Sequence, residues 1–137
     1  MGQKTYLTDN FYREEFACKD YCGFDNISLK LVVVLQAVRS FIGRKMQVRS
    51  GCRCEAHNRG EGGIKDSRHI YGDAADVRVE GVDPFMLAGI FYALHIEGQI
   101  DIKRLIPKRA GNYLHVALQG SKDAKSEYFA GFPKGEE

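Results

Sequence analysis

The sequence predicts one small α+β domain in which a mainly antiparallel sheet packs against flanking helices. Short alternating segments typical of strands are interleaved with two longer apolar segments typical of helices, and long connections join them. The length of 137 residues fits a single domain over 1–137 and lets the chain bury roughly two thirds of its unfolded surface. Hydrophobic content of 44% and charged content of 28% are ordinary for globular proteins, so disorder is expected only at the ends, including the tail Gly131–Glu137.

The first part of the chain contains an aromatic-rich segment, a helix and a strand. Residues 1–27 carry aromatic side chains without a sustained period, which predicts a short helical turn and a loop that wraps the core. A buried helix is predicted over Leu29–Ile42, because Ser28 is a good N-cap and Gly43 suits the C-terminal stop. Met46–Ser50 alternates and predicts the first strand.

The second part adds a long loop, two strands and a helix. Residues 55–75 contain several glycines and predict a loop of the kind that carries function in compact domains. Ala75–Val79 alternates as the second strand. A second helix begins at the cap and first-turn proline Asp83-Pro84, and Gly98 closes it. Asn112–Leu118 predicts the last strand.

The charge pattern gives no sign of a nucleic-acid partner. The net charge of +2 arises from 20 basic and 18 acidic residues spread along the chain, which is too balanced to indicate such binding. A basic cluster before the last strand predicts a solvated loop, and contact with an anionic polymer such as a cell wall is the alternative. The cluster comprises Lys103, Arg104, Lys108 and Arg109.

The sequence predicts neither a membrane span nor an export signal. The N-terminus lacks the apolar run of a secretory signal, and the longest apolar stretch, Leu31–Leu35, is too short to span a bilayer. We therefore expect a protein that is cytoplasmic as synthesised and has no membrane partner.

Four cysteines leave three interpretations open. Reduced, packed thiols are the first expectation without a secretory signal, and a redox-dependent bridge is the second. A structural zinc held by all four thiolates is the third, but Cys52 and Cys54 are separated by a single residue, where zinc knuckles usually have about two to four. The cysteines are Cys18, Cys22, Cys52 and Cys54.

Two histidines and an aspartate form the most informative pattern. His69 and Asp76 lie in the segment Ser67–Asp76, and His115 follows in the last predicted strand. Two imidazoles and one carboxylate are the ligand set of a catalytic zinc whose fourth position stays open for water. A non-haem iron site uses the same ligand types, but its carboxylate typically lies very close to its first histidine. We therefore predict a zinc hydrolase with Zn²⁺ as its cofactor.

Several motifs carry a family resemblance. The runs Ser50–Arg53, His57-Asn58, Gly62-Gly63, Ser67–Asp76 and His115-Val116 resemble the zinc D-alanyl-D-alanine carboxypeptidase and phage L-alanyl-D-glutamate endopeptidase family. The fold of that family is shared by the N-terminal signalling domain of hedgehog proteins. The resemblance covers roughly residues 11–120 and is specific in order and spacing.

The resemblance implies roles for individual residues. Its zinc ligands correspond to His69, Asp76 and His115, and Arg53 matches the arginine that binds substrate near the scissile bond. A metallopeptidase needs a donor for the oxyanion, and Arg53 is the natural candidate, with Ser67 orienting ligand or substrate. The implied substrate is a peptidoglycan stem peptide or another short peptide that contains a D-residue.

The general base is where the chain departs from the family. Some members carry an acidic residue or a histidine just before the last ligand, where this chain has Asn112 and Tyr113, and many phage-type members carry an aspartate where it has Ala117. An amide cannot accept the proton at neutral pH, and a phenol is more readily a donor, so Tyr113 is expected to hydrogen-bond the oxyanion. Asp73 and Glu61 lie in the functional loop and are the candidates to replace the base.

Together these observations predict a monomeric zinc peptidase that cuts a stem-peptide bond with a metal-activated water, as a DD-carboxypeptidase or an L,D-endopeptidase. Release to the cell wall during phage lysis would bring such an enzyme to its substrate. The alternative is a catalytically impaired module of the same fold, in which zinc stabilises a binding or structural domain.

Overall fold

The computed structural model describes residues 3–20, 22–63 and 67–119. Within them, four antiparallel strands form one sheet accompanied by helices, so the predicted α+β class is confirmed. The strands, in the spatial order β1-β2-β4-β3, are β1 (Gln47–Ser50), β2 (Ala74–Arg78), β4 (Tyr113–Ala117) and β3 (Arg104–Lys108). The helices are α1 (Leu29–Ile42), α2 (Glu55–Gly60) and α3 (Pro84–Ile96), with 3₁₀ turns η1 (Arg13–Phe16) and η2 (Arg68–Tyr71).

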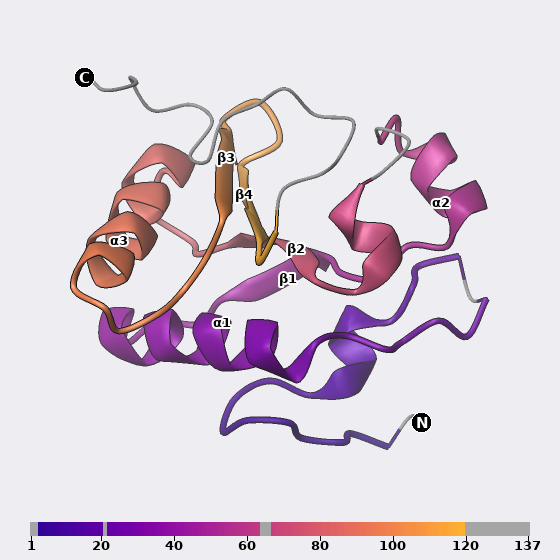
Figure 1. Cartoon of the computed structure of the whole chain (residues 1–137), viewed down its shortest axis with the longest axis horizontal. Helices are drawn as coiled ribbons and strands as arrows, with labels where there is room; N and C mark the ends of the chain where they lie inside the picture. Colours follow the sequence, from indigo (N-terminus) through magenta and orange to yellow (C-terminus); the bar gives the residue numbers. More distant parts are fainter. Residues whose placement is uncertain (1–2, 21, 64–66, 120–137) are drawn as a thin grey trace.

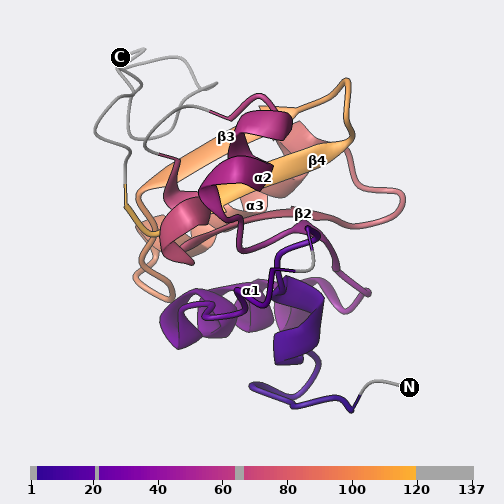
Figure 2. The same cartoon turned by 90° about the vertical axis from the view of Figure 1, so that its right-hand side faces the viewer.

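The two faces of the sheet have different neighbours. Figure 1 shows α3 on one side of β3 and β4, with α2 and η2 on the other side and α1 below. α3 packs against β3 and β4 and contacts α1, whereas η2 packs against β2 and α2. Figure 2 shows α2 in front of the sheet after a quarter turn. The long helices therefore cover the core, and the short ones flank the opposite face.

Strand register decides which side chains reach each face. Ala75 pairs with Val116 and Val77 with Leu114, and all four side chains are fully buried in the hydrophobic core. Successive strand residues point to opposite faces. The directly paired Asp76 and His115 therefore project together from the other face, toward the short helices.

The two long helices begin and end close to the predicted positions. The Ser28 hydroxyl accepts a hydrogen bond from the Leu31 amide at 3.3 Å, and Gly43 ends α1 with a left-handed φ of 75°. The Asp83 carboxylate accepts from the Phe85 amide at 2.8 Å at the start of α3, and Gly98 follows the end of that helix. The capping residues thus set the ends of both helices close to the positions that the sequence predicted.

Two sequence predictions were wrong in detail. The predicted loop 55–75 contains α2 and η2, and the predicted solvated loop around Arg104 is the strand β3. Pro107 and the flanking basic residues are not typical of a strand, so the sequence did not predict it. Among the described strands, β3 pairs only with β4 and lies at the edge of the sheet, where proline is tolerated. Arg104 is only 8% exposed and lies on the sheet face that carries His115.

The predicted tail Gly131–Glu137 lies outside the described residues. In the described part of the chain, no helix combines the length and apolar character that crossing a membrane requires.

Candidate metal centre

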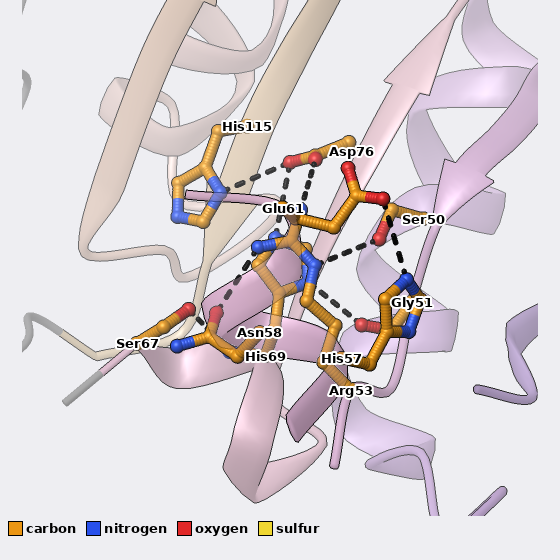
Figure 3. A network of polar contacts seen from close by, with 10 residues as sticks. All are labelled: Ser50, Gly51, Arg53, His57, Asn58, Glu61, Ser67, His69, Asp76 and His115. Atoms are coloured by element: carbon orange, nitrogen blue, oxygen red, sulfur yellow. Dashed lines mark hydrogen bonds and ion pairs between the residues drawn. The ribbon is translucent and has the colours of Figure 1, made fainter. Parts of the chain in front are cut away.

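Three predicted ligand side chains converge on one sheet face. Asp76 comes from β2 and His115 from β4, while His69 reaches them from η2 (Figure 3). One Asp76 oxygen, Oδ1, lies 3.2 Å from His69 Nε2 and 3.0 Å from His115 Nδ1. The candidate ligand atoms all lie within 4.8 Å of one another, so one ion could contact all three.

The environment of His69 fits a cation in this position. His69 Nδ1 lies 2.6 Å from the carbonyl oxygen of Gly51, and a carbonyl only accepts, so Nδ1 carries the proton. In the neutral ring, Nε2 then presents a lone pair to Asp76 Oδ1, which is also an acceptor. Two facing acceptors need a cation between them, and a hydrogen bond from the remote nitrogen is how metal-ligating histidines are usually held.

Local backbone structure places His69. The Ser67 hydroxyl accepts a hydrogen bond from the His69 amide at 3.2 Å and so caps η2. Gly72 ends η2 with a φ of +75°, and a Cβ there would lie 2.3 Å from the Asn26 carbonyl oxygen. Only glycine fits both the left-handed conformation and the close approach, so Ser67 and Gly72 define the two ends of the turn that presents His69.

Charge at the centre favours an ionised Asp76. Burial by itself raises the pKa of Asp76, but the two imidazoles beside its carboxylate outweigh burial and hold that pKa well below the usual range. Burial lowers the pKa of His115, which keeps its imidazole neutral at neutral pH. A carboxylate with neutral imidazoles is the protonation state that metal binding requires.

Arg53 fixes the second oxygen of Asp76. Its guanidinium lies 3.3 Å from Asp76 Oδ2 and also donates to the Ser50 hydroxyl and the Asn58 side-chain oxygen, each at 3.2 Å. Asn58 belongs to α2, and a Cβ at Gly63 would lie 2.0 Å from its Oδ1. Gly63 therefore leaves the space in which the Asn58 side chain supports Arg53, and Asp76 keeps Oδ1 turned toward the histidines.

The centre opens into a cleft of about 300 Å³. Arg53, Ser67 and Tyr113 line it, as do the β3 residues Arg104 and Lys108. The Arg49 guanidinium lies 4.5 Å from the centre of the Tyr113 ring. Burial and the charge of Asp76 raise the pKa of Tyr113 above its ordinary value, so its phenol remains a donor at neutral pH.

The two acidic candidates for the base have different positions. The Asp73 carboxylate is bound by the Arg68 guanidinium at 3.0 and 2.7 Å and is not among the described residues that line the cleft. Glu61 lines the cleft, and its carboxylate lies 3.4 Å from His57 Nε2. Glu61, rather than Asp73, therefore lies at the cleft.

Sequence reasoning missed several supporting residues. Ser50, Gly51 and Asn58 hold Arg53 and His69, and Arg104 contributes an unanticipated buried charge. The first three belonged to the motifs that carried the family resemblance, so a signal was present for their importance but not for their contacts.

Two imidazoles and one carboxylate that converge beside a cleft are the ligand set of a mononuclear catalytic zinc centre. A family model described as Peptidase M15 matches residues 9–117, and the chain belongs to this family of zinc-dependent peptidases. The predicted class, a zinc metallopeptidase, is confirmed at this level. Comparison with curated proteins finds no match.

Proposed function

We propose that the protein hydrolyses a peptidoglycan stem peptide, at a D-residue or an L-D junction, with zinc bound by His69, Asp76 and His115. The observation that carries this proposal is the convergence of His69 and His115 on Asp76 Oδ1 within an open cleft. Bound there, zinc supplies a Lewis acid that polarises the peptide carbonyl and makes water acidic enough to lose a proton near neutral pH.

The chain's own residues orient the reacting groups. A guanidinium has five N–H donors, and Arg53 uses three of them on Ser50, Asn58 and Asp76. The remaining two can donate to the substrate carbonyl as its oxygen gains charge. Tyr113, on strand β4, adds a phenol donor to the cleft.

Glu61 is the proposed proton acceptor. It is the acidic residue other than Asp76 among the described cleft-lining residues, and a carboxylate accepts a proton from water readily. Its contact with His57 Nε2 holds the side chain at the edge of the cleft. Glu61 thus takes the place of the base that the family carries on the last strand.

Arg104 supports an anionic substrate. Its Nε is buried and has no hydrogen-bond partner among the described residues, although a buried polar atom normally has one. The side chain lines the cleft on the face that carries His115. Arginine binds carboxylates well, so we assign Arg104 to the carboxylate that a stem peptide presents, either the D-alanine terminus or the D-glutamate α-carboxylate.

Mass spectrometry of defined stem peptides, incubated with the zinc-loaded protein, tests this proposal. Peptides with a free or amidated D-alanine terminus, and with D-glutamate or its α-amide, would separate the two carboxylate sources. We expect chelator-sensitive cleavage that His69→Ala abolishes. Stoichiometric zinc without cleavage of any of these peptides would instead favour the zinc-stabilised binding module. The observation that supports this alternative is the contact between the Glu61 carboxylate and His57, which engages the proposed base.

A further inference from the structure

A second cluster of ligand-type side chains lies outside the cleft. The sulfurs of Cys18, Cys22 and Cys54 lie within 4.8 Å of one another. His57 Nδ1 lies 3.2 Å from Cys18 Sγ. Thiolates bound to one tetrahedral zinc at 2.3 Å would be roughly 3.8 Å apart, so small side-chain movements would bring these atoms to that geometry.

The spacing in the chain matches zinc knuckles once His57 is included. Cys18 and Cys22 enclose three residues, and Cys54 and His57 enclose two. Both spacings suit structural zinc, whereas the pair Cys52 and Cys54 did not. Cys52 is fully buried in the hydrophobic core, so the structure removes it from the cluster and supplies an imidazole instead.

Contacts around the cluster are those of a metal site. His57 directs Nδ1 toward the sulfurs and Nε2 toward the Glu61 carboxylate at 3.4 Å, the carboxylate–histidine arrangement that orients ligating imidazoles. The Cys54 amide donates to Cys18 Sγ at 3.5 Å, and the His57 amide donates to Cys54 Sγ at 3.4 Å. Such donors stabilise the negative charge of thiolates.

We propose that Cys18, Cys22, Cys54 and His57 bind a second, structural zinc ion. A site with three thiolates and one imidazole offers no open position and is of the structural type. It joins the segment after η1 to the beginning of α2, where Cys54 is the N-cap. Arg53 and Asn58 directly adjoin two of the ligands, so this ion also steadies the residues that hold Asp76.

This inference does not depend on peptidase activity, and its experiment excludes the cleft site. The His69→Ala variant, prepared under anaerobic reducing conditions, is loaded with Co²⁺ alone and then with Zn²⁺ alone. We expect one ion per chain and a near-ultraviolet thiolate-to-cobalt absorption band, which ligands from histidine and aspartate cannot produce. Zinc at a hundredfold excess over its Kd should raise the melting temperature by about 10 °C.

Two further variants in the same background locate the ion. Cys22→Ser alters an exposed residue and should abolish both the band and the thermal shift, while Cys52→Ala, outside the cluster, should keep them. The proposal is overturned if the His69→Ala protein binds no ion, if its cobalt form lacks the thiolate band, or if Cys22→Ser retains both. A wild-type protein that binds both ions but cuts no peptide would overturn the proposed function alone.

Discussion

Replacing Arg104 with methionine should make the protein more stable and less active. Its Nε is a buried donor without a partner among the described residues. Leaving such a donor unsatisfied costs about 1–3 kcal/mol, and methionine removes it while preserving much of the apolar stem. At roughly 4 °C per kcal/mol for a domain of this size, the melting temperature of the substrate-free protein should rise by about 4–12 °C.

Activity should change in the opposite direction. A hydrogen bond to a charged group contributes about 1.5–3 kcal/mol, so the loss in kcat/KM should be about ten- to hundredfold. The loss should be confined to substrates that present the carboxylate. A peptide whose corresponding carboxylate is amidated should be cut equally well by Arg104→Met and by the wild type.

Lys108→Met is the matched control for the stability effect, because it removes a positive charge from the same strand but from an exposed side chain. Its stability should change by less than about 0.5 kcal/mol. Thermal melts and kinetics on the free and amidated peptides measure both effects. A lower melting temperature for Arg104→Met would refute the unsatisfied donor, and an equal loss on both peptides would refute carboxylate binding.

Three other predictions test the site. Glu61→Gln should lose about 10²–10⁴-fold in kcat while retaining zinc in the cleft. Asp73→Asn should keep most of its turnover, because Arg68 already binds the Asp73 carboxylate. If single-turnover assays show the larger loss for Asp73→Asn, Asp73 and not Glu61 is the base. Gly72→Ala should destabilise the protein more than Gly43→Ala in urea unfolding. Both glycines have a φ of +75°, but only at Gly72 would an added Cβ lie 2.3 Å from a backbone oxygen. Equal losses of stability would contradict this steric contact. Ala117→Asp places a carboxylate opposite Arg104 in the β3–β4 register and should reduce carboxylate-dependent cleavage, whereas a large gain in turnover would reveal a missing base instead.

The sequence was sufficient to predict the fold class and the convergence of the three candidate metal ligands, because both depend on local signals. Caps at Ser28 and Asp83 define the two long helices, and strand alternation places Asp76 and His115 on one face. The turn chemistry around His69 is equally local, since Ser67 and Gly72 lie within a few residues of it.

Contacts between distant segments could not be predicted in the same way. Strand β3 carries a proline and basic ends, and its register with β4 places the buried Arg104 on the face that carries His115. Similarly, His57 had no recognisable role until folding brought it beside Cys18, which is 39 residues away. In both cases the missing information was which distant segments of the chain lie side by side in the fold.

The segment from Ser50 to Glu61 contributes to both proposed metal sites. The Gly51 carbonyl fixes the tautomer of His69, and Arg53 holds Asp76, so this segment controls two ligands of the cleft without binding the ion itself. Breaking a buried ion pair such as Arg53–Asp76 by removing one partner costs about 3–5 kcal/mol, yet such pairs add little net stability over apolar residues. The contribution of Arg53 is therefore geometric, and it requires a rigid backbone. An ion bound through Cys54, the N-cap of α2, and His57 in its first turn would provide that rigidity where the polypeptide has only a six-residue helix.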